Sequence, residues 1–490
     1  MSSPDKTAQD DSEQPDQPDT QSKPKAVFTT GSTMRHVVVM TATGSVGLMA
    51  IFLVDIANLF YISLLGQREL AAAIGYASTI MFFSISIGIG LTIAATAIVA
   101  RSIGAGESER SRKLAATSLF YVGVLTSLFA IALYPALESI LYFVGARDET
   151  LRIALEFMQI VTPSIPIMGM GMCLSGILRA KGDARRAMHV TLSGGVAAAI
   201  LDPILIFTFD LGLNGAAIAT VLTRIVLLLV GIHGAHRVHR QIGQLDFSLV
   251  KNMAKPFATI AGPAVITQIA TPVGNAYVTA SIASFGDDAV AGWAIVGRLI
   301  PLTFGAIFAL SGSVGPILSQ NYGARLFPRV QATMRDALLF SLAYSILTWV
   351  LLALCADLIV QLFNAQDDAA SFVRFFCYAV AGSFIFNGFL FVANAAFNNL
   401  GHPFYATIFN WGRATLGVIP FVYVGKSYGA EGVLAGWGLG AIVFGIGAVI
   451  VAFRTISKLP DEQREKDDLP PPATPPAAHS PFSSGKASAA

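Results

Sequence analysis

The stretch IGYASTIMFFSISIGIGLTIAATAIV, residues 74–99, determines the fold class of this chain. It runs for 26 residues without a single Asp, Glu, Lys or Arg. About 20 apolar residues in an α-helix are enough to cross a bilayer core of about 30 Å. The stretch therefore predicts a membrane-spanning helix.

Comparable apolar runs lie on both sides of this stretch and fill most of the chain. Charged residues make up 13% of the sequence, whereas soluble domains carry about 25%. We therefore expect an all-α polytopic membrane protein with twelve transmembrane helices. Their predicted positions are 37–65, 74–99, 114–145, 151–179, 187–209, 213–239, 255–285, 288–320, 331–364, 369–399, 404–425 and 430–457.

The two ends of the chain differ from this pattern. Residues 1–33 and 458–490 are rich in polar, charged and proline residues, a composition typical of disordered tails. The first tail lacks the apolar core of a signal peptide. We expect both segments to be disordered and to lie outside the membrane.

The distribution of Lys and Arg predicts the orientation. Loops on one side of the membrane carry most of them, as between the second and third helices, where Arg101, Arg110, Arg112 and Lys113 follow one another. Cytoplasmic loops are the ones enriched in these residues. Both termini are thus predicted to be cytoplasmic, in a multi-pass protein of the cell membrane (the inner membrane in a Gram-negative cell). The net charge of +2, without a basic stripe, argues against nucleic acid as a partner.

Three glycine landmarks recur along the chain. Gly104 and Gly323 end corresponding helices, and Gly182 and Gly401 follow corresponding helices; both pairs are 219 residues apart. The motif that begins at Gly212 recurs in the second half as Gly429-x-x-Gly432. The chain therefore consists of two similar six-helix halves.

Because each half contains an even number of helices, both enter the membrane in the same direction, as in a parallel repeat. We assign residues 34–240 to an N-terminal lobe, 241–254 to a cytoplasmic linker and 255–457 to a C-terminal lobe. Two such halves enclose a central cavity, which favours a transporter that opens alternately to each side. A fixed pore is the alternative from this pattern alone.

Two acids stand within predicted spans of the first half. Charges in the hydrocarbon region are costly and mark functional sites. Asp55 has Asn58 one turn later on the same helix face, and Asp202 and Thr220 lie at similar depth in the fifth and sixth helices. These hard oxygen atoms suit Na⁺, so Asp55, Asp202 and Thr220 are candidate ligands. Two neighbouring carboxylates at low dielectric also suit a proton carrier.

The second half lacks this cluster. The repeat places Gly274 and Asn275 where Asp55 would lie, and its seventh helix offers Gln268 but no acid. Cation coupling is therefore predicted in the first half only. Arg224 and Arg413 also fall within spans, and pairing, substrate binding and snorkelling remain open for them.

A cavity between the halves would be lined by adaptable apolar and polar side chains. Aromatic and Met side chains suit varied substrates, although ordinary helix packing explains them equally well. The candidates for contact with substrate are Phe60, Met172, Gln268, Asn275 and Arg298.

Motifs for enzymatic chemistry are lacking. The sequence contains no Walker A motif, and its three cysteines show neither zinc spacing nor a disulfide pattern. We expect neither an enzyme nor a bound cofactor beyond the coupling ion.

The order of several short motifs resembles one known family. The segment Val54-Asp55-Ile56-Ala57-Asn58-Leu59-Phe60 is similar to the first helix of the multidrug and toxic compound extrusion (MATE) family. Residues 95–106, LRAKGD at 178–183, LDP at 201–203 and GAAIAT at 215–220 resemble later family segments in the same order. The likeness covers about residues 30–457.

This resemblance implies two lobes that form a V-shaped central cavity. It implies export of small cationic or amphipathic compounds, by antiport against H⁺ or Na⁺. Asp55, Asp202 and Thr220 match the N-lobe cation site of the DinF-like branch. One position departs from that branch, because Ala198 stands where Asn is frequent. The loss of that oxygen favours H⁺ over Na⁺. Other branches have an acid where this chain has Gln268.

Three functions follow from the sequence. The first is a monomeric, cation-coupled exporter of drug-like cations, working within the lipid bilayer. A flippase for lipid-linked precursors is the alternative, which would use cavity cations such as Arg224, Arg298 and Arg413 to hold phosphates. A receptor or scaffold without transport is the third, and the buried acids argue against it.

Overall fold

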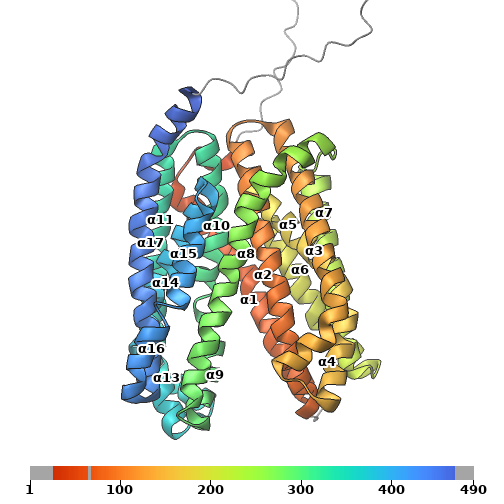
Figure 1. The fold of residues 1–490 in the computed structure, drawn as a ribbon, viewed down its shortest axis with the longest axis vertical. Coiled ribbons are helices and arrows are strands. Elements are labelled where there is room, and N and C mark those ends of the chain that lie inside the picture. The colour runs from red at the N-terminus through yellow and green to blue at the C-terminus, as the bar shows by residue number, and fades with distance from the viewer. Residues whose placement is uncertain (1–25, 65–67, 469–490) are drawn as a thin grey trace, which may run out of the picture.

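The computed structural model describes residues 26–64 and 68–468, with all side chains in these ranges except those of 55–60, 62–64, 68, 69, 71 and 462–468. Helices fill almost all of this part of the chain, and it contains no strand. The all-α prediction is confirmed. Both ends of the described chain leave the bundle at its top in Figure 1, which we call the terminal end.

The first six predicted spans correspond to seven α-helices, which form the N-lobe. Their bounds are α1 (Thr33–Leu64), α2 (Arg68–Gly104), α3 (Ser108–Val144), α4 (Asp148–Val161), α5 (Ile165–Lys181), α6 (Ala184–Pro203) and α7 (Gly212–Ile232). A 3₁₀ turn joins α4 to α5, so that both belong to one span. π-Helical turns, η3 (Ile204–Thr208) and η4 (His233–Val238), extend α6 and α7.

The remaining ten α-helices form the C-lobe. They are α8 (Phe247–Ala283), α9 (Asp287–Thr303), α10 (Gly305–Gly323), α11 (Phe327–Leu354), α12 (Ala356–Leu362), α13 (Asp367–Tyr378), α14 (Phe384–Leu400), α15 (Pro403–Ala414), α16 (Ile419–Gly425) and α17 (Gly429–Asp468). In Figure 1 the two lobes converge at the terminal end and diverge toward the other end, giving the V shape.

The number of crossings agrees with twelve. Ten helical stretches of the described chain are long and apolar enough to span a membrane, and α9 with α10 forms one further span bent by 45°. One of the ten stretches, Pro403–Asp461, has 59 residues. A straight helix of that length would measure about 90 Å. Instead α15 and α16 pack beside α17, so this stretch supplies two crossings.

Three helix pairs make most of the contact between the lobes. α1 packs on α10, and α2 packs on both α8 and α10. Ser313 of α10 donates a hydrogen bond to the Met40 carbonyl of α1 at 3.1 Å. Gly90 of α2 lies so close to Val265 of α8 that an added Cβ would be 2.6 Å from the Val265 backbone nitrogen.

The glycine landmarks of the repeat have the same structural role in both lobes. Gly182 ends α5 with φ at 92° and Gly401 ends α14 with φ at 100°. Only glycine adopts this left-handed conformation without a steric cost. Gly212 and Gly429, which begin α7 and α17, also have positive φ. The glycines that recur in the sequence therefore stand at equivalent helix ends in the two lobes.

Three predicted segment boundaries were wrong. Residues 26–32 form an ordered segment rather than disordered tail, because Phe28 is buried, with only 1% of its surface exposed. The helix α8 begins at Phe247, inside the predicted linker, because Asp246 caps it by accepting from the backbone of Ser248 and Leu249. The helix α17 continues to Asp468 into the second predicted tail, since Glu, Gln, Arg and Lys there favour helix.

Candidate functional site

Among the N-lobe acids whose side chains the structure describes, Asp202 is the buried one. It lies in the last turn of α6, and only 2% of its surface is exposed. Pro203 follows it, and the chain continues as the π-helical turn η3. π-Turns of this kind are frequent at functional sites. The backbone therefore changes from α to π geometry directly beyond this carboxylate.

The packing of α1 on α6 places Asp55 near Asp202 along the helix axis. The two helices run parallel, because Gly47 lies against Thr191 and Gly195 lies against Ala50. Continuing that register brings the backbone of α1 around residues 55–58 level with the last turn of α6. The side chains of Asp55, Asn58 and Phe60 are outside the described part of the chain, so the contact itself stays a prediction.

Thr220 lies on α7, which packs on α6. Its hydroxyl donates to the Ala216 carbonyl at 2.9 Å, one turn earlier. This bond uses the single proton and leaves the oxygen lone pairs available as a ligand. Residue 198 on α6 is alanine and adds no oxygen.

The equivalent place in the C-lobe is filled by aromatic side chains. The repeat pairs Asp202-Pro203 with Ile419-Pro420, and Thr220 with Trp437. The Trp437 ring lies 5.6 Å from Trp293 and 5.9 Å from Phe384, centroid to centroid. An apolar cluster of this kind offers no ligand for a cation.

The predicted substrate contacts lie on different elements. Met172 on α5 packs its sulfur against Gly88 of α2 within the N-lobe. Gln268 and Asn275 are half-buried on α8, while Arg298 on α9 is exposed. None of the hydrogen bonds or ion pairs between described residues joins these side chains to one another. Their role in substrate binding stays a prediction.

The two buried arginines have neutral partners. Arg224 donates to the Ser164 hydroxyl at 2.8 Å and to the Val161 carbonyl at 3.2 Å. Arg413 donates to the Thr271 hydroxyl of α8 at 3.0 Å. No acid pairs with either guanidinium among the described side chains. Both arginines join helices within one lobe, which is a structural role.

A hydrogen-bonded contact between the lobes closes the terminal end, and sequence reasoning missed it. Arg101 at the end of α2 donates to the Asn399 carbonyl of α14 at 2.9 Å. Gln320 at the end of α10 donates to the Ala180 carbonyl of α5 at 2.7 Å. We call these four residues, with Gly104 and Gly323, the inter-lobe seal.

The two bonds of the seal are equivalent under the repeat. Arg101 and Gln320 are 219 residues apart, and so are Ala180 and Asn399. Between the two bonds, α2 and α10 cross at glycine. A Cβ at Gly104 would overlap the Gln320 carbonyl, and one at Gly323 would overlap the Arg101 carbonyl. The glycine landmarks were the signal that could have found this seal, because they recur beside Arg101 and Gln320.

The ordered segment of residues 26–32 covers the seal. The backbone nitrogen of Phe28 donates to Gln320 Oε1 at 3.0 Å, and its carbonyl accepts from Arg329 at 3.0 Å. Val27 packs against Gly182 of the N-lobe. The segment therefore contacts both lobes at once.

One carboxylate outside the spans fixes the loop between α5 and α6. Asp183 accepts from the Arg186 backbone at 3.0 Å and pairs with His239 at 2.7 Å. Burial alone raises the pKa of Asp183, but the hydrogen bonds from Arg186 and His239 outweigh it and hold this pKa below its usual range.

Comparison with known proteins agrees with this geometry. The family model described as MatE matches residues 45–204 and 263–424, one segment in each lobe. The chain belongs to the MatE family. The match confirms the family that the sequence motifs indicated. This family consists of multi-pass membrane transporters rather than enzymes.

Two relatives and one solved structure are similar to this MatE protein over most of its length. A protein of Shewanella oneidensis named FAD transporter is 26% identical over 85% of this chain and 93% of its own length. The multidrug export protein MepA of Staphylococcus haemolyticus is 24% identical over 80% of this chain and 87% of its own. The crystal structure of a variant of the Vibrio cholerae MATE transporter VcmN superposes with a TM-score of 0.81 at 27% identity, covering 87% and 97%.

Proposed function

We propose that this MatE protein exports small cationic or amphipathic molecules by antiport against H⁺ or Na⁺, with the cation bound in the N-lobe. The proposed site consists of Asp55, Asn58, Asp202 and Thr220. The observation that carries the proposal is the burial of Asp202 in a helix packed along α1. An exporter named for multidrug transport among its relatives supports the substrate class.

Cation binding would drive the change of conformation. One charge within the hydrocarbon region costs about 2.5–3.5 kcal/mol. Moving a two-state equilibrium from 1:99 to 99:1 takes about 5.5 kcal/mol. One carboxylate supplies about half of that difference, so the free energy calls for neutralisation of both Asp55 and Asp202.

The inter-lobe seal is what alternating access would have to break. It is closed here, and the distribution of Lys and Arg assigns the terminal end to the cytoplasm. Opening toward the cytoplasm requires release of both equivalent hydrogen bonds and of Phe28. Substrate and cation act on this one equilibrium, so each changes the apparent affinity of the other.

A flavin nucleotide is a second candidate substrate. The Shewanella relative that aligns over 93% of its length is named FAD transporter. FAD is an anion with a large aromatic ring, unlike the cations that the family resemblance suggests. The same N-lobe coupling would serve either substrate, so the two candidates differ only in the cargo.

The experiment uses purified protein in proteoliposomes. A pH gradient or a Na⁺ gradient is imposed separately, and efflux of ethidium or of FAD is followed. We expect efflux of ethidium driven by the pH gradient, lost in Asp55→Asn while expression and monodispersity stay normal. Efflux driven only by Na⁺ would assign the site to Na⁺ in spite of Ala198.

Two outcomes would contradict the proposal. Efflux of equal rate in Asp55→Asn and in the unmodified protein would exclude coupling through this site. Failure of every gradient to move either probe would favour the lipid-precursor flippase, which a scrambling assay with a labelled lipid phosphate would then detect.

A further inference from the structure

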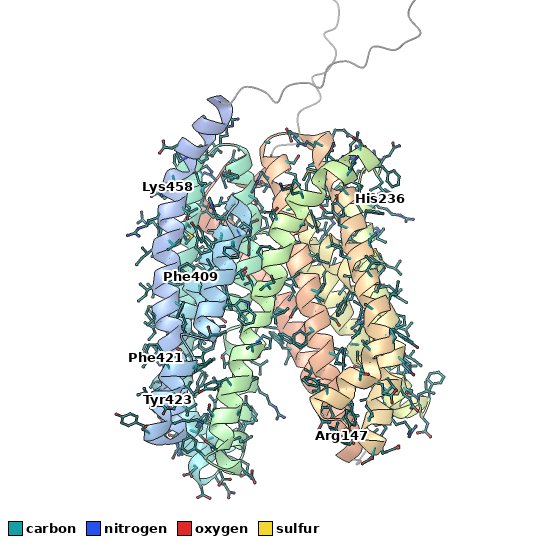
Figure 2. The ribbon with its side chains drawn as sticks, viewed as in Figure 1. Arg147, His236, Phe409, Phe421, Tyr423 and Lys458 are labelled. Carbon is teal, nitrogen blue, oxygen red and sulfur yellow. The ribbon has the colours of Figure 1, made fainter. Side chains whose placement is uncertain are left out.

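A basic cavity lies at the terminal end of the N-lobe, away from the inter-lobe contact. Its volume is about 350 Å³, and it is lined by Arg112, His236, Arg237, Arg240 and Ile242. Figure 2 shows His236 at the outer margin of the N-lobe, at the same end as Lys458. The cavity thus lies where the candidate span Gly212–Val238 ends, and the ends of membrane-crossing helices are where headgroups are expected.

Most of the positive charge of this cavity has no acidic partner. None of the ion pairs between described side chains includes Arg237 or Arg240. Arg112 pairs with Glu109 at 3.0 Å, and its Nε donates to the Arg240 carbonyl at 2.7 Å. Two guanidinium groups are therefore free to bind an anion in bidentate fashion.

The backbone around the cavity is held in place by α3. The buried amide of Gln241 donates to the Ser111 hydroxyl at 3.0 Å, and the backbone nitrogen of Gly243 donates to the Arg112 carbonyl at 3.0 Å. The wide turn of η4 and the left-handed Arg240, with φ at 47°, precede these bonds. The arginines are thus presented by an anchored loop rather than by a free tail.

Exposed apolar side chains lie close in sequence to the cavity residues, seven and four residues before His236 and five residues after Ile242. Leu229 and Ile232 on α7 are 59% and 37% exposed, and Phe247 at the start of α8 is 72% exposed. Exposed apolar side chains beneath a group of arginines match a lipid, whose acyl chains lie below its phosphate. A free anion in water would use only the arginines.

We propose that this cavity binds the phosphate headgroup of an anionic phospholipid of the cytoplasmic leaflet, with Arg237 and Arg240 as the anion-binding residues. Basic pockets between helices on this side of a membrane are suited to such headgroups. The site is separate from the cation site, since it lies at the end of α7 and Asp202 lies at the far end of α6. Its occupant is a structural lipid and not the exported substrate.

The test measures binding of fluorescent phosphatidylglycerol to the full chain, delipidated in neutral detergent, by fluorescence anisotropy. Fluorescent phosphatidylcholine serves as the zwitterionic comparison and inorganic phosphate as the free competitor. The variant is Arg237→Gln with Arg240→Gln. The matched control is Arg454→Gln with Lys458→Gln, two exposed cations of α17 at the same end.

We expect phosphatidylglycerol to bind at least about tenfold more tightly than phosphatidylcholine, and the variant to lose about tenfold or more while the control changes less than about twofold. Millimolar inorganic phosphate should not displace the lipid. Equal binding in variant and unmodified protein would overturn the proposal. Displacement by inorganic phosphate would also overturn it and assign a free-anion site instead.

A second measurement guards against misfolding of the variant. Binding to the unmodified protein should weaken as KCl rises from about 0.1 to 0.5 M, because salt screens exposed charges. Binding that is independent of salt would contradict recognition by arginine even if no variant could be purified.

Discussion

The two lobes agree at the terminal end and differ toward the opposite end. At the terminal end, Arg101 and Gln320 make equivalent hydrogen bonds across the seal. Toward the opposite end, Asp202 of the N-lobe corresponds to Ile419 of the C-lobe. Both halves of the repeat have kept the features that let the lobes close, whereas only the N-lobe has a carboxylate at this position. Under the proposed mechanism, closing is a property of both lobes and coupling belongs to the N-lobe alone.

The largest effect expected from this difference is at Trp437. Replacing it by Ala removes a ring packed between Trp293 and Phe384, which should lower the free energy of unfolding by about 3–5 kcal/mol. Thr220→Ala at the equivalent N-lobe position should change that free energy by less than about 1 kcal/mol yet impair coupling. Unfolding in SDS mixtures and gradient-driven efflux measure the two quantities. Impaired coupling with unchanged stability in Trp437→Ala would contradict the contrast between lobes.

The crossing of α2 and α10 is expected to tolerate no side chain. Gly104→Ala forces a Cβ against the Gln320 carbonyl, so the helices must separate at a cost of about 1–3 kcal/mol. Gly262→Ala on α8 is the control, since an added Cβ there has no neighbour within 4 Å. Thermal unfolding should show a lower melting temperature for the first variant only. Equal melting temperatures would mean that the crossing is looser than described.

The two hydrogen bonds of the seal can be compared by exchanging their donors. Arg101→Leu removes the donor to Asn399 and should open the seal more often, since a bond from a charged group contributes about 1.5–3 kcal/mol. Arg101→Gln keeps an amide donor, as at Gln320, and should have a smaller effect. Hydrogen–deuterium exchange of the backbone amides in residues 99–104 and 320–325 reports the opening. Identical exchange in both variants would exclude a role for the donor.

The smallest effect is expected outside the membrane, at Asp183. Its pKa is held below the usual value, so its contribution to stability is present above about pH 4 and is lost as the pH falls through the lowered pKa. Asp183→Asn keeps a capping oxygen but loses the ion pairs to Arg186 and His239. The unmodified protein should therefore lose more stability between pH 5 and 3 than the variant, by about 1 kcal/mol or less. Parallel pH curves of the melting temperature would contradict this.

Much of the fold could be predicted because hydrophobic runs and glycine positions are local signals. Twelve runs predicted the crossings, and Gly182 and Gly401 predicted the repeat. The ordered segment 26–32 could not be predicted, because the backbone of Phe28 is bonded to Gln320 and Arg329, which lie about 300 residues away in the sequence. Most residues around Phe28 are polar, so the sequence of this segment resembled a disordered tail.

The candidate site could be predicted only in part. A carboxylate within an apolar run is visible in the sequence, so Asp202 could be named from it; Asp202 is buried, and its role in cation binding stays a prediction. Arg101 was interpreted only as a marker of orientation. Its contact with α14 could not be predicted, because the acceptor is a backbone carbonyl, which every residue type has. The basic cavity could not be predicted either, because it forms only where the loop after η4 places Arg240 beside Arg112.

The most direct test of one-sided coupling is the ion movement elicited by substrate in proteoliposomes. Addition of ethidium should release or take up H⁺ (or Na⁺) in the unmodified protein and in Ile419→Ala, at the C-lobe position equivalent to Asp202. We predict no ion movement in Asp202→Asn of the N-lobe, with the protein still folded and inserted. Ion movement that persists in Asp202→Asn, or is lost in Ile419→Ala, would contradict the assignment of coupling to the N-lobe.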